Sequence, residues 1–363
     1  MEQTHHTSVF HLHIEMSLKD LNRKERTILK KYGQVEKGLY RDVLVPADMT
    51  LHALHYAIMR LFGWQNCHLH HYELPPKTFA HLTEDNLSKW LHLVGVYFRF
   101  PGEDWEDLYW DDDYRGDQGL KTWLKKKYTG PYIYKGWSEH YLSSQQAVQE
   151  WISQAGQHQG SLQEQRFAFE NPHLEALLER LTVSDLLIPN HQYIQTKSIQ
   201  AYVRRVLNWP DVENSLQEAG SKKFRSHKQA RIYYEEHDPK PMPLTHLLHY
   251  FYDEGDGWAL EISCKEIYRC HEGQWLDSRD RPISTWRNEL AEVASRYRPL
   301  CIEKDGIELL DDIGGLTGFC QMLETLFDFE RLDADSIEQR RELFLWAYDR
   351  GWTGNTIRLK STL

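Results

Sequence analysis

The sequence predicts an α+β protein: a β-grasp-like sheet, mixed or antiparallel, with packed helices and a mostly helical insertion. The first observation is the order strand, strand, helix, strand within the first 74 of 363 residues, which places a helix on one face of a sheet. The second is the return of strand-like alternation near residue 244, after a long stretch of weaker pattern. The third is a composition with 40% hydrophobic and 13% aromatic residues, which supplies a packed core.

The local pattern is clearest in the first part of the chain. Period-2 alternation predicts three strands, at residues 8–16, 39–46 and 67–74. The first two are joined by a charged stretch that is compatible with a linker or a short helix. Between the second and third strands, apolar residues recur at helical spacing over residues 51–62, with Thr50 as the N-cap and Gly63 at the C-terminal stop.

The remainder of the chain predicts further helices and one strand pair. The strands flank the segment YDEGDGW at residues 252–258, whose glycines and carboxylates suit a tight reversal. Helical stripes are predicted at residues 143–156, 171–187, 284–297, 314–327 and 336–352. We therefore divide the chain into a first part of the core at 1–74, a mostly helical insertion at 75–242, and a second part of the core with C-terminal helices at 243–363.

Charge and cysteine content argue against several classes of protein. With 54 acidic and 43 basic residues the net charge is −11, which repels a phosphate backbone and restricts nucleic-acid binding to a local patch. There is no run of about 18 apolar residues and no basic-then-apolar leader, so we predict a cytoplasmic protein without a membrane partner. The 5 cysteines form no C-x-x-C pair, so neither a disulfide framework nor a zinc ribbon is predicted.

Three blocks of sequence resemble one known family. They are LYRDVLVPADMTLHALHYAIMRLFGWQNCHLHHYEL at residues 39–74, YFYDEGDGWALEI at 250–262 and RPLCIEKDGIELLDDIGGLTGFCQMLETL at 298–326. Their content and order resemble the signature blocks of the plasmid pRiA4b ORF-3-like family, some of whose members are described as mobile-element passenger proteins of the TnpR type. A large insertion separates the first block from the second.

The resemblance implies a fold more than an activity, because no motif for DNA strand exchange goes with the family blocks. This chain also departs from the family pattern at several positions. Tyr40-Arg41-Asp42 replaces Trp-Arg-Arg, Glu254 replaces Phe, Leu260 replaces His, and Leu309-Leu310-Asp311-Asp312 replaces Pro-Pro-Glu-Asp. The pair Gly314-Gly315 that follows is interpreted as a helix cap, because the two preceding carboxylates oppose a phosphate.

The candidate metal ligands are His68, His70, Asp253 and Asp256. In a strand, His68 and His70 point to the same face, so the imidazole pair could hold a divalent ion if a carboxylate arrived from the turn. Against this, the turn lacks the calcium-loop template, because the position eleven residues after Asp253 is Cys264 rather than a glutamate. No G-x-S-x-G, P-loop or Rossmann fingerprint occurs, so no cofactor is signalled and the sequence favours a non-enzyme.

The leading hypothesis is a non-catalytic cytosolic binding or adaptor protein, linked to plasmids or mobile elements, with a protein or peptide partner. Its predicted surface is a polar rim around exposed aromatic residues, made of Phe62, Trp64, His68, His70, Asp253, Asp256 and Trp258. One alternative is a metal-dependent hydrolase or nuclease that uses the four metal candidates. The other is a DNA-binding accessory protein that uses the local basic patch of Lys222, Lys223, Arg225, Lys228 and Arg231.

Overall fold

A computed structural model describes residues 8–94, 97–99, 161–164, 174–179, 181–195, 244–328, 334–355 and 359–360. The helix predicted at residues 143–156 and the basic patch at residues 222–231 lie outside these ranges. None of the described helices is long and apolar enough to cross a membrane.

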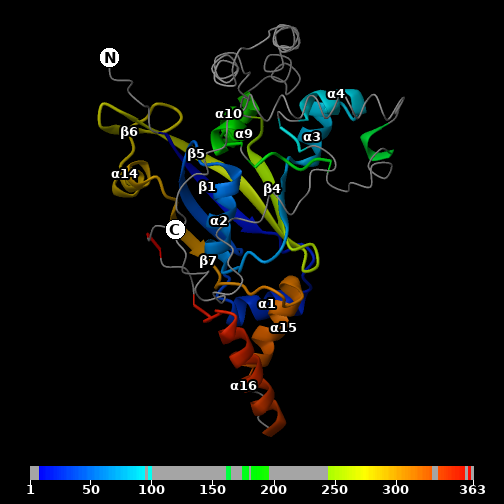
Figure 1. The fold of residues 1–363 in the computed structure, drawn as a ribbon. Helices are drawn as coiled ribbons and strands as arrows, with labels where there is room; N and C mark the ends of the chain where they lie inside the picture. Colours follow the sequence, from blue (N-terminus) through cyan, green and yellow to red (C-terminus); the bar gives the residue numbers. More distant parts are fainter. Residues whose placement is uncertain are drawn as a thin grey trace, which may run out of the picture.

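One sheet of seven strands organises the described part of the chain (Figure 1). The strands are β1 Ser8–Met16, β2 Tyr40–Pro46, β3 His70–Glu73, β4 Leu247–Tyr252, β5 Trp258–His271, β6 Gln274–Leu276 and β7 Leu300–Asp305. Their order is β3-β4-β5-β1-β2-β7, with β6 paired to β5, and each of these pairs is antiparallel. The predicted α+β class is confirmed, and the sheet is of the antiparallel kind.

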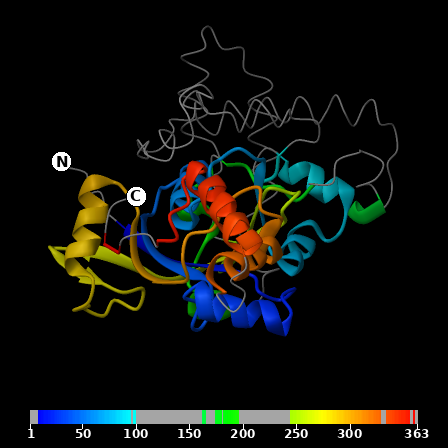
Figure 2. The same ribbon diagram turned by 90° about the horizontal axis from the view of Figure 1, so that it is seen from below.

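Nine named helices surround this sheet in the described part of the chain. They are α1 Arg23–Tyr32, α2 Leu51–Phe62, α3 Pro76–Thr83, α4 Leu87–Leu93, α9 Val183–Leu186, α10 Asn190–Gln195, α14 Arg287–Arg296, α15 Gly315–Phe327 and α16 Ala334–Asp349. Figure 1 shows α1, α15 and α16 together at one end of the molecule and α14 near β6 at another. The view in Figure 2 shows α16 on the outside of the molecule, next to α15.

The helix α2 begins and ends where its capping residues predict. The Thr50 side chain accepts a hydrogen bond from the backbone N–H of Ala53, and Gly63 adopts a left-handed φ of 85°. Ten of the helix residues are buried against the sheet, including both histidines, His52 and His55. The charged stretch before β2 forms α1, which starts with a reciprocal capping box between Asn22 and Glu25.

The alternation along β1 divides the core between the two faces of the sheet. Phe10, Leu12 and Ile14 belong to the large cluster that also contains α2 and α15, as predicted for one face. Val9 points the other way, into a smaller cluster that includes Leu290 and Val293 of α14. The sheet therefore carries an apolar cluster on each face, although the second face of β1 also presents the polar residues His11 and His13.

The helix predicted over residues 171–187 is wrong for most of its length. Residues 174–179 contain no helix, and their backbone instead forms isolated bridges, Ala176 to Glu73 and Leu177 to Phe98. The N–H of Leu177 donates to the carbonyl of Tyr72 at 2.8 Å. Only α9 is helical here, because pairing with distant backbone outweighs the helical spacing of the leucines.

Arg41, in one of the family-like blocks, is a structural residue. Its side chain is fully buried and lies 5.0 Å above the Phe62 ring. Its guanidinium donates to the backbone carbonyls of Tyr40, Leu61, Asp305 and Ile307. Burial lowers the pKa of Arg41 to about 10, and the four carbonyls hold the charge in place between β2, α2 and the end of β7.

Candidate functional site

The turn between β4 and β5 is built by Asp253 and two glycines. One oxygen of the Asp253 carboxylate accepts the backbone N–H groups of Gly255 at 3.0 Å and Asp256 at 3.3 Å. Asp253 and Gly257 both adopt positive φ, 52° and 66°, and the N–H of Gly257 donates to the carbonyl of Asp253 at 2.7 Å. The predicted reversal between two strands is therefore present, and it is held by one carboxylate of the segment itself.

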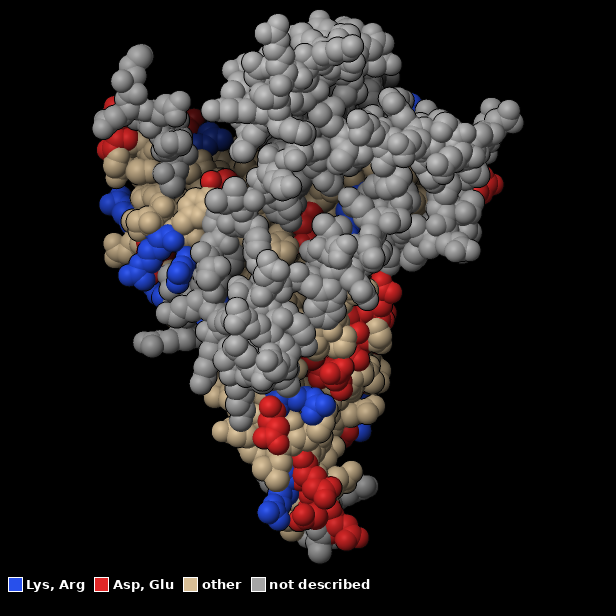
Figure 3. Space-filling model, in the orientation of Figure 1, with Lys and Arg blue, Asp and Glu red and all other residues tan. Residues whose placement is uncertain are grey.

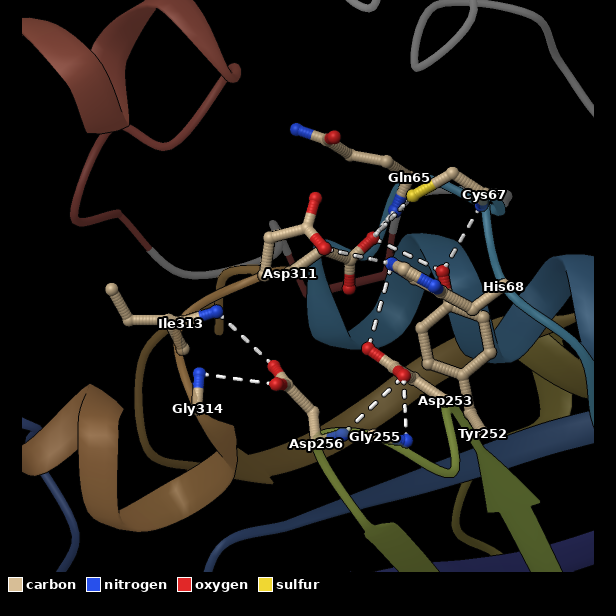
Figure 4. A network of polar contacts seen from close by, with 11 residues as sticks. Gln65, Cys67, His68, Tyr252, Asp253, Gly255, Asp256, Asp311, Ile313 and Gly314 are labelled. Carbon is tan, nitrogen blue, oxygen red and sulfur yellow. Dashed lines mark hydrogen bonds and ion pairs between the residues drawn. The ribbon is translucent and has the colours of Figure 1, made fainter.

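Asp256 connects this turn to the start of α15 (Figure 4). Its two carboxylate oxygens accept the N–H groups of Ile313 and Gly314, both at 3.1 Å. A side chain at Gly315 would place its Cβ 2.2 Å from the carbonyl oxygen of Asp256, and Gly315 has a φ of 64°. The turn and the start of α15 are therefore joined in two ways: the Asp256 carboxylate holds the backbone of the helix start, and the absence of a side chain at Gly315 allows the close approach of the Asp256 carbonyl.

Asp311 is the centre of the polar network in Figure 4. Its carboxylate is fully buried, and Oδ2 accepts the N–H of Gln65 at 2.5 Å and the hydroxyl of Tyr252 at 3.1 Å. The Tyr252 oxygen in turn accepts the N–H of Cys67 at 3.2 Å. Burial raises the pKa of Asp311 to about 7, which its hydrogen bonds only partly offset. We call this meeting of residues 65–68, 252–256 and 311–315 the three-segment junction.

The rim of the three-segment junction carries a cysteine, a histidine and two carboxylates. His68 Nε2 lies 3.1 Å from Asp312 Oδ1 and 3.4 Å from Asp253 Oδ2. Ligand-capable atoms of Cys67, His68 and Asp312 all lie within 4.8 Å of one another. Burial first, and then the Asp311 and Asp312 charges, raise the pKa of the Cys67 thiol to about 12.

The aromatic residues predicted for an exposed surface are buried instead. Phe62, Trp64 and Trp258 lie beneath the three-segment junction and form part of the main core. The Trp64 ring stacks on the Tyr252 ring with centroids 4.9 Å apart, and on Phe62 at 5.4 Å. The prediction of exposed aromatic residues was wrong, because these rings pack on one another in the core and support the junction from below.

His70 also lies away from the three-segment junction, in a buried cluster of its own. Its Nε2 is 2.9 Å from Glu179 Oε1, and its ring stacks on His55 at 3.4 Å between centroids. Glu179 is also 3.0 Å from His52 Nδ1, so two imidazoles hold one carboxylate that comes from residues 174–179. Burial lowers the pKa values of His55 and His70. The Glu179 carboxylate is therefore held beside two buried rings, His52 and His70.

The four metal candidates predicted from sequence are thus not brought together as one set. His68 and Asp253 are 3.4 Å apart, whereas His70 contacts Glu179 and Asp256 binds the start of α15. Sequence reasoning did not place Cys67, Asp311 and Asp312 in the site. The sequence indicates a role for these three residues only by placing them in the family-like blocks. No local pattern could show that they meet, because Asp311 lies 59 residues from Tyr252 and 246 from Gln65.

These features define an α+β protein on one antiparallel sheet, with a polar junction where three distant segments meet. Residues 32–134 match the family model described as plasmid pRiA4b ORF-3-like protein, which confirms the resemblance to that family. The match runs past residue 74, where the first part of the core was predicted to end. Leu82, Leu87 and Trp90, just beyond that point, belong to the main core cluster.

No curated protein matches the chain. Among solved structures, the chain is similar to a crystal structure of a protein of unknown function, MM3350, from Methanosarcina mazei Go1. That alignment has 14% identity and a TM-score of 0.35, and it covers 97% of this chain and 95% of the other. At this TM-score the similarity carries no argument about fold or function.

Proposed function

We propose that the chain is a non-catalytic cytosolic binding or adaptor protein that self-associates through α16. The observation that carries this proposal is the exposed apolar face of that helix. Ile337, Phe344, Leu345 and Tyr348 are each between 46% and 52% exposed. A link to plasmids or mobile elements has support only from the name of the matching family. The five free cysteines suit a reducing compartment.

The exposed face of α16 is distinct from the side that packs on the body of the protein. Leu343, Trp346 and Ala347 contact the main core, and Trp352 beyond the helix donates its Nε1–H to the carbonyl of Glu308 at 3.0 Å. Apolar residues therefore surround much of the helix, a pattern typical of helices buried on two sides. The helix is anchored on one side and needs a partner on the other.

The arrangement of side chains on this face favours a second copy of the chain as the partner. Most soluble oligomers are two-fold symmetric, with the same patch on both subunits. In an antiparallel pair that sets Ile337 against Tyr348 of the second copy, Arg341 comes opposite Phe344 of the second copy. The Arg341 side chain lies 3.8 Å from Glu338, and because it is 70% exposed its guanidinium can form a cation–π contact with an aromatic ring of the second copy. Figure 3 shows basic and acidic surface next to uncharged surface at this narrow end of the molecule.

The test is the molecular mass in solution over a range of concentrations. Sedimentation equilibrium from about 1 μM to about 1 mM covers specific but weak association. We expect the mass to rise from 43.2 kDa toward twice that value. The double variant Phe344→Ser, Tyr348→Ser should stay monomeric with an unchanged circular dichroism spectrum. Leu69→Ser, at an exposed apolar residue elsewhere, is the matched control and should associate as the wild type does.

A wild-type protein that stays monomeric over that range would overturn the proposal. So would a double variant that associates as strongly as the wild type, because the contact would then lie elsewhere. If the monomeric wild type is captured by a different protein in a manner that depends on Phe344, the α16 face binds a heterologous partner instead, and self-association is rejected.

The two alternatives have less support from the described residues. A hydrolase that uses His68, His70, Asp253 and Asp256 needs these groups around one ion, and His70 instead stacks on His55 beside Glu179. The basic patch at residues 222–231, on which DNA binding would depend, lies outside the described ranges. Retention on a DNA column that falls steeply with salt would support that alternative over self-association.

A further inference from the structure

The rim of the three-segment junction has the composition of a transition-metal site. A thiol, an imidazole and a carboxylate, from Cys67, His68 and Asp312, lie within 4.8 Å of one another. Ligands at about 2.0–2.3 Å from a tetrahedral zinc ion are separated by roughly 3.3–3.8 Å, so only a small contraction is needed. Sulfur and imidazole nitrogen favour zinc and similar ions over magnesium and calcium.

The backbone around these side chains is already fixed in place. Cys67 donates its N–H to the Tyr252 hydroxyl at 3.2 Å, and the neighbouring Gln65 donates its N–H to Asp311. Asp312 has a left-handed φ of 56° and is followed by residues whose N–H groups Asp256 holds. The three side chains therefore project from two segments that the junction joins, which is the support a metal site requires.

A second observation comes from Asp311, which lies behind the rim. Its side chain is fully buried, and Oδ1 has no hydrogen-bond partner within the part of the chain that the structure describes. Its other oxygen, Oδ2, lies 3.8 Å from Cys67 Sγ (Figure 4). A buried carboxylate oxygen without a donor is costly unless a cation is close.

The charge balance of the rim favours a cation from solution. Asp253, Asp311 and Asp312 meet at this place, and His68 Nε2 lies beside two of them, Asp253 and Asp312. Asp256 is not part of this group, because its two oxygens accept the backbone N–H groups of Ile313 and Gly314 at the start of α15. Asp312 is 50% exposed on its side chain, so an ion can enter from solvent without any rearrangement of the core.

We propose that Cys67, His68 and Asp312 bind one divalent ion of the zinc class, with Asp311 supporting the site from behind and solvent at the fourth position. Three protein ligands and an open position describe many zinc sites. Asp253 Oδ2 faces the same His68 nitrogen, Nε2, as Asp312 does, so its carboxylate would add negative charge beside the ion. This ligand set differs from the one predicted from sequence in two ways: Cys67 and Asp312 enter, and His70, Asp253 and Asp256 leave. The proposal is independent of the α16 interface.

Equilibrium dialysis of the full chain against zinc, with metal analysis, tests the proposal. We expect one zinc per chain, and magnesium or calcium in excess should not displace it. Cobalt should give the near-ultraviolet absorption of a cobalt–thiolate bond. Cys67→Ser should remove this band, and Asp312→Asn should weaken zinc binding by roughly 10-fold or more. Because Asp312 is at the surface, its variant should fold as the wild type does, and circular dichroism checks this.

Matched controls separate this site from adventitious binding to the 20 histidines of the chain. Cys270→Ser changes another partly exposed cysteine, and Asp20→Asn removes another exposed carboxylate, so both should bind like the wild type. Zinc should also raise the unfolding temperature of the wild type more than that of Asp312→Asn at the same zinc concentration. Less than one zinc per chain, or uptake that survives both Cys67→Ser and Asp312→Asn, would overturn the proposal.

Discussion

Replacing Asp256 with alanine removes both hydrogen bonds that join the β4–β5 turn to the start of α15. The two oxygens each accept one backbone N–H, from Ile313 and Gly314, at 3.1 Å. Hydrogen bonds to a charged group contribute roughly 1.5–3 kcal/mol each, and a half-buried carboxylate belongs at the lower end. Two such bonds give about 3 kcal/mol, which is the fall we expect in the free energy of unfolding.

Urea denaturation followed by circular dichroism measures this loss. With a denaturant slope of about 3 kcal/mol per M, the midpoint should fall by roughly 1 M at unchanged slope. Asp256→Asn retains one neutral acceptor and should lose about half as much. Asp20→Asn, which removes an exposed carboxylate from another turn, is the control and should match the wild type. If Asp256→Ala is as stable as that control, within about 0.5 kcal/mol, the link between turn and helix does not stabilise the fold.

Three further predictions concern the buried polar residues and the junction glycine. Arg41→Met leaves four backbone carbonyls without their donor and should lower the free energy of unfolding by about 3 kcal/mol or more; a loss below about 1 kcal/mol in urea denaturation would contradict its structural role. Gly315→Ala should lower the free energy of unfolding by about 1–3 kcal/mol and reduce the stabilising effect of Asp256, because the new Cβ would lie 2.2 Å from the Asp256 carbonyl oxygen. If the losses of Gly315→Ala and Asp256→Ala add in the double variant, this contact does not couple the two residues. Burial lowers the pKa values of His55 and His70 below the ordinary 6.5, so as the pH falls the unfolded chain binds protons before the folded chain does. The free energy of unfolding should therefore fall as the pH drops below about 6.5, by up to about 1.4 kcal/mol per pH unit for each ring. In His55→Gln, this dependence on pH between about 6.5 and 5 should be weaker.

Local features of the fold follow from the sequence because neighbouring residues determine them. The N-cap Thr50 and the stop at Gly63 bound α2 as expected, and the alternation of β1 sorts its residues between two faces. The strands β6 and β7 were not predicted: β6 has only three residues, and β7, with the sequence LCIEKD, does not alternate between apolar and polar residues. The helix predicted from the leucines at 174–178 is absent for a different reason: the backbone of Leu177 pairs with Tyr72 and Phe98, which are far away in the sequence.

The candidate site depends on contacts between segments that no local pattern encodes. Asp253 could be assigned to its own turn, because its partners Gly255 and Asp256 are neighbours. Asp311 could not be assigned, because the donors that surround it come from Gln65 and Tyr252. The burial of Trp64 is likewise a result of stacking on Tyr252, which periodicity alone does not show.

The meeting of the three segments at Asp311 is tested most directly by a double-mutant cycle. Tyr252→Phe removes only the hydroxyl, and Asp311→Asn keeps the shape of the side chain, so each variant alters the 3.1 Å contact with little change in packing. Residues in contact within one hydrogen-bond network couple by about 0.5–3 kcal/mol. We predict a coupling free energy in that range from urea denaturation of the wild type, the two single variants and the double variant. Losses that add to within about 0.3 kcal/mol would contradict the junction.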